Sequence, residues 1–266
     1  MKLDILMSCM HQTDDTLIRA SRITGNAVVI NQCDREEERE YATENGRVRF
    51  LSTKARGLTR SRNMAIAESR ADVCLLCDDD EVFVPDYEAK ILAAWESLPQ
   101  ADVLIFRMVN YPCAFGDTVR RLKFPQTMHV ASWQISFRRE RLLASGVRFD
   151  ELLGAGSGNG AEEELKFLLD CQRAGLQIWY APVDIATVAQ QESTWFDGFN
   201  EKFFYARGAT TRYILGAPLA AAYGLYYVAR KKAMYSRTIT PGSALGAIFR
   251  GILDNPITKQ ARKRKA

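Results

Sequence analysis

Short apolar runs alternate with helical patterns along the first two thirds of the chain. Five runs rich in Val, Ile and Leu are predicted strands, at residues 3–9, 27–33, 48–51, 73–77 and 103–109. Most of them are apolar throughout, which is typical of strands buried on both faces of a parallel sheet. Helical patterns lie between several of them, including 57–69 and 87–98. The pattern predicts an α/β protein with a doubly wound, largely parallel sheet.

Weaker signals follow this part of the chain. Residues 133–138 alternate as a short strand, and residues 178–180 form a last predicted strand that ends before Pro182. The loop 154–160 contains four glycines. Because no clear strand precedes it, a dinucleotide-binding loop is disfavoured, and we expect a flexible lid or substrate loop.

Three consecutive carboxylates, Asp78, Asp79 and Asp80, follow the predicted strand 73–77. Burying unpaired charge is costly, so they must leave the sheet at the carboxyl end of the strand, where open α/β sheets place their ligands. If the segment stays extended, Asp78 and Asp80 face one target while Asp79 faces elsewhere. Converging carboxylates suit Mg²⁺ or Mn²⁺, especially when a substrate phosphate completes the coordination. A solvated acidic turn is the alternative interpretation.

A second acidic group, Glu162, Glu163 and Glu164, opens a predicted helix that ends at Gly175. The helix dipole alone favours acids in a first turn, so a purely structural role is an even alternative to a chemical one. The sequence leaves both open.

The C-terminal part of the chain has a different character. From Asn200 onwards there are 13 Lys or Arg and two acids, whereas the whole chain has a net charge of +4. The uncharged segment 214–229 is short for a membrane span, and three basic residues follow it. Apolar helices edged with basic residues favour an in-plane, anionic membrane surface. A nucleic-acid tail is disfavoured, and ordinary helix packing with a disordered tail is the remaining alternative.

Length and cysteine usage set further bounds. The chain has 266 residues, enough for one large domain with an appendage. Its six cysteines are scattered, and the Cys74–Cys77 pair lies inside a predicted strand without a second pair. We therefore expect buried thiols in a reducing cytoplasm rather than a zinc or redox site. The N-terminus has no long apolar core, so no signal peptide is predicted.

Five motifs occur in an order that resembles a known family. They are Gly57-Leu-Thr-Arg-Ser-Arg-Asn63, Leu75-Leu-Cys-Asp-Asp-Asp80, Ser132-Trp-Gln-Ile-Ser-Phe137, Phe149-Asp-Glu-Leu-Leu-Gly154, and Glu163-Glu164 followed by Phe167 and Ala174-Gly175. Each is common alone. Together they resemble the inverting glycosyltransferases of family 2, which have the GT-A fold, over residues 3–204. The resemblance implies a GT-A domain at 1–204 and a helical, basic extension at 205–266.

The resemblance also implies roles for individual residues. In the family, the donor is a nucleotide-diphosphate sugar, here expected to be a UDP-sugar. The donor site is expected to be lined by Asp34, Arg62, Asn63, Asp78 and Asp79. Asp78 and Asp80 are expected to bind Mn²⁺ or Mg²⁺ on the diphosphate. The base that deprotonates the acceptor hydroxyl is expected to be Glu164, with Glu163 beside it.

Two departures from the family pattern concern the chemistry. The base position is Glu rather than Asp, which is longer by one methylene. Such enzymes often have a His after the last strand, and Val188–Thr194 has none. Metal coordination would then depend on Asp80, the diphosphate and water alone.

These features predict transfer of a sugar to a glycan or lipid-linked acceptor in envelope polysaccharide synthesis, at the inner face of the membrane. Two other classes stay open. A sugar-phosphate nucleotidyltransferase would also need a sheet and metal carboxylates, but its glycine- and lysine-rich signature is missing near the first strand. A non-catalytic membrane scaffold with a degenerate site is the third class.

Overall fold

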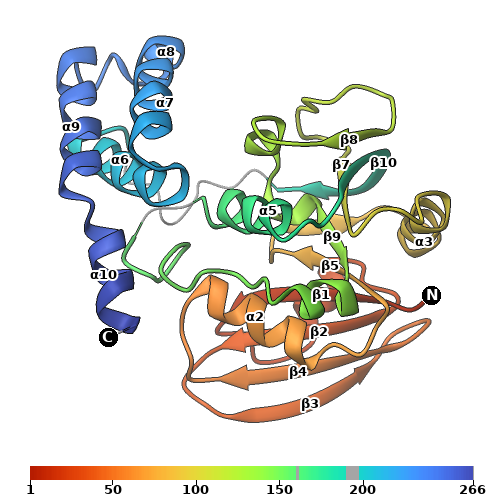
Figure 1. Cartoon of the computed structure of the whole chain (residues 1–266). Helices are drawn as coiled ribbons and strands as arrows, with labels where there is room; N and C mark the ends of the chain where they lie inside the picture. Colours follow the sequence, from red (N-terminus) through yellow and green to blue (C-terminus); the bar gives the residue numbers. More distant parts are fainter. Residues whose placement is uncertain (160–161, 190–197, 266) are drawn as a thin grey trace. The chain divides into compact units, whose positions relative to one another are not determined.

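The computed structural model of the chain describes residues 1–159, 162–189 and 198–265 (Figure 1). The chain divides into two compact units. We call Met1–Asp150 with Glu164–Gln191 the sheet unit, and Glu151–Glu163 with Glu192–Ala266 the helical unit. Each is described by itself below.

One mixed sheet contains all the strands of the described residues. They are β1 (Leu3–Met10), β2 (Asn26–Gln32), β3 (Glu37–Ala42), β4 (Arg47–Thr53), β5 (Val73–Cys77), β6 (Glu81–Phe83), β7 (Val103–Met108), β8 (Arg120–Leu122), β9 (Ile135–Arg138) and β10 (Ile178–Val188). The order is β3-β4-β2-β1-β5-β9-β7-β10-β6, and β8 pairs with β10. Strands β4, β2, β1 and β5 are parallel, as are β7 and β10. The predicted doubly wound, largely parallel sheet is confirmed.

Helices cover both faces of this sheet (Figure 1). They are α1 (Thr16–Ala20), α2 (Leu58–Glu68), α3 (Tyr87–Ser97), α4 (Arg139–Ser145) and α5 (Glu163–Arg173), with short 3₁₀ turns η1 (Gln126–His129) and η2 (Ser132–Gln134). Residues of α1 and α3 pack on one face, and those of α2, α4 and α5 on the other. Alternate residues of β5 enter the two cores, so this strand is buried on both faces, as predicted.

Some strand boundaries differ from the prediction. The strand predicted at 178–180 continues to Val188, so the predicted end before Pro182 was wrong. The pairing of β10 with β7 shifts register between Tyr180 and Asp184, and Pro182 lies in that irregularity. A proline there interrupts no regular ladder, which is why the strand can pass through it. The strand predicted from Trp133 begins only at Ile135.

The helical unit contains α6 (Glu201–Leu215), α7 (Ala217–Arg230), α8 (Lys232–Tyr235), α9 (Pro241–Asp254) and α10 (Pro256–Lys265). The uncharged segment 214–229 is divided at Gly216, whose φ of 82° ends α6. Helices α6 and α9 meet backbone to backbone: a Cβ on Gly208 would lie 2.1 Å from the Ile248 carbonyl oxygen. Among the described residues, no helix is both long and apolar enough to span a bilayer.

Candidate active site

The parallel strands bring several sequence-predicted residues to one edge of the sheet. Strands β4, β2, β1 and β5 run in the same direction, so their carboxyl ends meet at that edge. Asp34 follows β2, Gly57 lies between β4 and α2, and Asp78 follows β5. The chain reaches β4 on one side of β1 and returns through α2 to β5 on the other side. Asp78 therefore lies at the topological switch point, where doubly wound sheets bind ligands.

The three carboxylates after β5 lie in a tight connection to β6. Asp79 and Asp80 form a turn, so the expectation of an extended segment, with side chains alternating along it, was wrong. Asp79 is exposed, whereas Asp78 and Asp80 are half-buried. Burial and the charge of Asp78 raise the pKa values of Asp79 and Asp80. Crowded carboxylates of this kind repel one another, and a cation among them relieves the repulsion.

Asp78 is held from three directions. Arg62 Nη2 donates to its Oδ1 at 2.8 Å, and Ser132 Oγ donates to its Oδ2 at 3.1 Å. Its backbone N–H donates to Glu81 Oε1 at 2.6 Å. The Arg62 side chain is only 2% exposed, so this ion pair is screened little by water. The orientation of Asp78 is therefore set by the protein before any ligand arrives.

Arg62 and its neighbour Asn63 also fix the loop after α4. The Arg62 guanidinium lies 5.5 Å from the centre of the Phe149 ring, which stacks on Phe167 of α5 at 4.2 Å. The Asn63 amide donates to the Phe149 carbonyl and accepts from its N–H, both at 2.9 Å. Both residues thus have a structural role at the candidate site. Their contact with a nucleotide stays a prediction.

Glu81 is a site residue that the sequence reasoning missed. Its side chain is buried on β6, and its Oε2 has no hydrogen-bond partner among the described residues. Burial, together with the charge of Asp78, raises its pKa well above the ordinary value. The available signal was its place as the fourth consecutive acid after β5. Its function here is to anchor the Asp78 backbone.

Asp34, by contrast, points into solvent. Its side chain is 92% exposed and forms an ion pair with Arg56. Arg56 also donates to the Cys33 and Thr53 carbonyls, which ties it to the ends of β2 and β4. Gly57 follows with a φ of 114°, and its N–H donates to the Gln32 side chain at 2.8 Å. The amino end of α2 and Arg56 both favour an anionic group at this edge.

The predicted base residues begin α5. Glu163 is buried and Glu164 is half-buried. Helix α5 leads into β10, whose first residue Ile178 pairs with the first residue of β7 at the opposite edge of the sheet. Eleven helical residues span about 16 Å, so the start of α5 returns towards the edge with the carboxyl ends of the strands. Topology thus places Glu164, which belongs to the sheet unit, on the same side of the sheet as Asp78.

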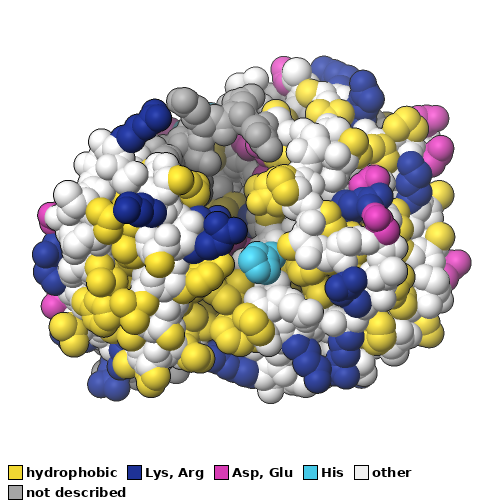
Figure 2. Space-filling view, turned by 90° about the horizontal axis from the view of Figure 1, so that it is seen from above, with side chains coloured by type: hydrophobic (Ala, Val, Ile, Leu, Met, Phe, Trp, Pro, Cys, Tyr) yellow, Lys and Arg dark blue, Asp and Glu magenta, His cyan; other side chains and the backbone are white. Residues whose placement is uncertain are grey.

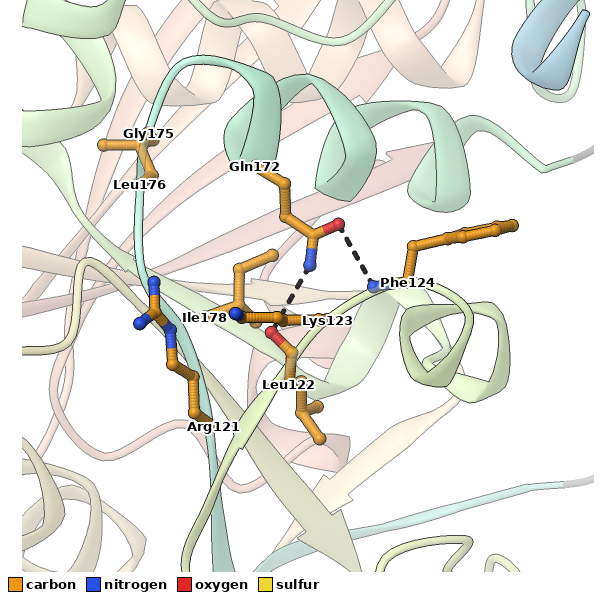
Figure 3. Close-up of a pocket in the computed structure, with 8 residues that line it drawn as sticks. All are labelled: Arg121, Leu122, Lys123, Phe124, Gln172, Gly175, Leu176 and Ile178. Carbon is orange, nitrogen blue, oxygen red and sulfur yellow. Dashed lines mark hydrogen bonds between the residues drawn. The ribbon is translucent and has the colours of Figure 1, made fainter.

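A pocket of about 320 Å³ lies elsewhere in the sheet unit (Figure 3). Its lining residues are Arg121, Leu122, Lys123, Phe124, Gln172, Gly175, Leu176 and Ile178. Gln172 bonds to the backbone of Leu122 and Phe124, both at 3.3 Å (Figure 3). Ile178 is the first residue of β10, so this pocket is at the amino ends of the strands. Its position does not match a ligand site at the carboxyl edge.

Within the described part of the chain, no group of three or more His, Cys, Asp or Glu side chains has the geometry of a preformed metal site. Most of the segment after β10 in which the family often has a His, residues 190–194, lies outside the described residues. So does the end of the glycine-rich loop, at 160. All six cysteines are free thiols, and five of them are buried, as expected.

Comparisons with known proteins agree with the fold of the chain. The sequence model of the family described as Glycosyl transferase family 2 matches residues 26–150. The crystal structure of S. aureus TarS 1-349 matches 95% of this chain over 81% of its own, with a TM-score of 0.60 and 14% identity. The same protein in complex with UDP-GlcNAc matches 90% of this chain over 74% of its own, with a TM-score of 0.59 and 14% identity. No curated protein matches the chain in sequence. The matches confirm the expected fold class.

We predict that Arg62→Met lowers the free energy of unfolding by about 3 kcal/mol, because it leaves Asp78 without its buried partner. The loss of a charge-assisted hydrogen bond to Asp78 should also weaken donor binding about tenfold. Urea unfolding and calorimetric titration measure the two effects.

The matched control is Arg19→Met, which breaks an ion pair with Asp15 at the surface. Arg19 is 66% exposed, so the control should change stability by no more than about 0.5 kcal/mol. Equal effects of the two substitutions would show that the Arg62–Asp78 pair contributes no more to stability or donor binding than a surface ion pair does.

Proposed function

We propose that the protein is a glycosyltransferase of family 2, because residues 26–150 match the sequence model of that family and the fold is similar to that of TarS. It transfers a sugar from a nucleotide-diphosphate sugar to a hydroxyl group of a glycan or lipid-linked acceptor, with inversion. The observation that carries the proposal is the Asp78–Asp80 turn at the switch point of the sheet, clamped by buried Arg62. The complexes of TarS with UDP-GlcNAc and UDP support a UDP-sugar as the donor.

The donor end of the reaction needs positive charge. The diphosphate leaving group carries about two negative charges, which grow as the bond to the sugar breaks. A divalent ion, Mn²⁺ or Mg²⁺, would neutralise this charge when bound. The crowded carboxylates of Asp78 and Asp80 fit a hard cation and would hold it. Arg56 and the amino end of α2 add positive potential at the same edge, and Asp34 is exposed there to contact the nucleoside.

The acceptor end needs a base. A sugar hydroxyl is a weak nucleophile, so a carboxylate must take its proton as the new bond forms. Glu164 is our proposed base, with Glu163 beside it at the start of α5. The amino end of the helix favours the ionised carboxylate that this role requires. A single displacement with one base inverts the anomeric carbon and needs no covalent intermediate.

The C-terminal helices support a membrane role for the extension at 205–266. On α7, the exposed face is apolar and consists of Pro218, Leu219, Ala222, Leu225, Tyr226 and Ala229. Arg230, Lys231 and Lys232 follow directly and are exposed. Figure 2 shows hydrophobic side chains gathered over the helical unit, with Lys and Arg side chains at the margins. We propose that this face lies on an anionic bilayer, which would hold the enzyme near a lipid-linked acceptor.

The proposed activity predicts slow release of nucleoside diphosphate from one member of a panel of UDP-, GDP- and dTDP-sugars, with Mn²⁺ and without acceptor. Asp80→Ala should abolish metal-dependent donor binding and leave thermal unfolding unchanged, because Asp80 lies at the solvent edge. Asp79→Ala, which changes an exposed side chain of the same turn, should have the milder effect.

Calorimetry with and without Mn²⁺ measures donor binding for each variant. Wild-type binding by the alanine variants of Asp78, Asp79 and Asp80 would remove the metal assignment. Release of pyrophosphate from a sugar phosphate and a nucleoside triphosphate would favour a nucleotidyltransferase instead.

A second prediction concerns the base. Glu164→Gln should lower the rate constant of transfer by about 10²–10⁴-fold, because glutamine keeps the size but cannot accept the proton. Donor affinity should be nearly unchanged. Glu163→Gln is the control, since the assignment depends on counting to Gly175. If only Glu163→Gln loses turnover, the base is Glu163 instead of Glu164. If both variants keep full turnover, the start of α5 does not supply the base.

The third prediction concerns the membrane face. Lys231→Gln with Lys232→Gln should weaken binding to phosphatidylglycerol vesicles by about 2 kcal/mol, or about 30-fold, because each near-surface cation contributes about 1 kcal/mol. Leu225→Gln with Tyr226→Gln should remove the part of the binding that survives high salt. Vesicle sedimentation at low and high salt measures both.

Leu143→Gln, at an exposed leucine of α4 in the sheet unit, is the matched control and should bind like wild type. If both double variants bind as strongly as this control, the α7 face does not meet the membrane.

A further inference from the structure

Helix α6 carries a largely but not fully buried arginine, Arg207, inside the helical unit. Its side chain is 18% exposed. Its Nη1 donates to Glu162 Oε1 at 2.6 Å and contacts the Tyr223 hydroxyl oxygen at 3.0 Å. A cation that loses most of its water needs a close partner, because removing charge from water is costly, and Glu162 supplies that partner.

Aromatic rings complete the surroundings of Arg207. The guanidinium lies 5.2 Å from the centre of the Phe203 ring and 4.4 Å from that of Tyr227. Both distances are within the range of cation–π attraction. Burial lowers the pKa of Arg207, but Glu162, Tyr223 and Tyr227 outweigh it and the net pKa is raised. The guanidinium therefore stays charged and has few orientations open to it.

Glu162 occupies an unusual backbone position. Its φ is +82°, in the left-handed region that residues other than glycine seldom adopt. Such a conformation persists only where the surroundings impose it. The ion pair with Arg207 is a contact that can do so. Glu162 immediately precedes α5, whose first two residues are Glu163 and Glu164.

We propose that Arg207 is a positioning residue for the catalytic base: through Glu162 it fixes the backbone that leads into α5, and so fixes where the next two carboxylates begin. This inference depends on the proposed function, because it assumes that the base is one of those two residues. It also divides the acidic triplet. Glu162 is paired with Arg207 and anchors the chain, whereas the proposed base is one of the two residues that follow it.

The decisive variant is Glu162→Asp in the full-length enzyme, because it keeps both charges of the pair and shortens the anchor by one methylene. We expect the rate constant of transfer to fall about 10–100-fold, since small displacements of a catalytic group are costly in rate. The calorimetric Kd for the donor and the KM for the donor should stay within twofold of wild type. Arg207→Lys keeps the charge without the planar guanidinium. Its rate constant of transfer should lie between those of Glu162→Asp and wild type.

A matched control is an ion pair between α6 and α9. Arg250 Nη2 bonds to Glu201 Oε2 at 2.7 Å, also within the helical unit, but the two side chains are 57% and 63% exposed. Glu201→Asp and Arg250→Lys make the same chemical changes in a solvated pair. Their transfer rates and donor affinities should equal those of wild type.

The outcomes separate this inference from the proposed function. Wild-type transfer by Glu162→Asp, alongside an inactive Glu164→Gln or Glu163→Gln, overturns the positioning role and leaves the base assignment intact. A parallel loss of rate, donor affinity and thermal stability in Glu162→Asp indicates a merely structural pair and also overturns it. If Arg207→Lys fails to fold, the test depends on Glu162→Asp and Tyr223→Phe. Tyr223→Phe removes only one contact of Arg207. It should lower the rate constant of transfer without changing donor affinity.

Discussion

The main constraint on the sheet unit is that the buried strand β5 is followed directly by a charged residue, Asp78. Strand β5 is apolar on both faces, and the next residue is a carboxylate. Arg62 makes this possible, because its buried guanidinium forms an ion pair with Asp78 and lies over the ring of Phe149. Without it, an unpaired carboxylate would border two hydrophobic cores, which is the costly arrangement that folded proteins avoid.

The same arginine connects elements that are distant in the sequence. Arg62 lies on α2, Phe149 follows α4, and the Phe149 ring stacks on Phe167 of α5. Asn63 adds two hydrogen bonds to the Phe149 backbone. A shift of α2 would thus move Asp78 and disturb the packing of α5 together. The carboxylate turn and the helix that begins with Glu163 and Glu164 are parts of one packed arrangement, which suits a reaction that needs both in register.

What the sequence predicted depends on the range of the interactions involved. Strand β5 was predicted with its correct ends, because five apolar residues followed by Asp78 form a local signal. Strand β3, Glu37–Ala42, was missed, because its charged residues suit an edge strand as well as a loop. The buried state of Arg62 could not be predicted either, since its partner lies 16 residues away on another element. The sequence identified the carboxylates after β5, but only the fold shows which partner each one has.

The acids of the candidate site differ more in exposure and in neighbouring charge than in residue type. Asp34 is exposed to solvent and pairs with Arg56. Desolvation raises the pKa values of Asp79 and Asp80, and the charges of the neighbouring carboxylates add to this effect. Glu81 is buried, and its Oε1 accepts from the Asp78 backbone N–H, while its Oε2 has no hydrogen-bond partner among the described residues. Desolvation and neighbouring charge therefore give carboxylates of the same chemistry different properties within a single chain.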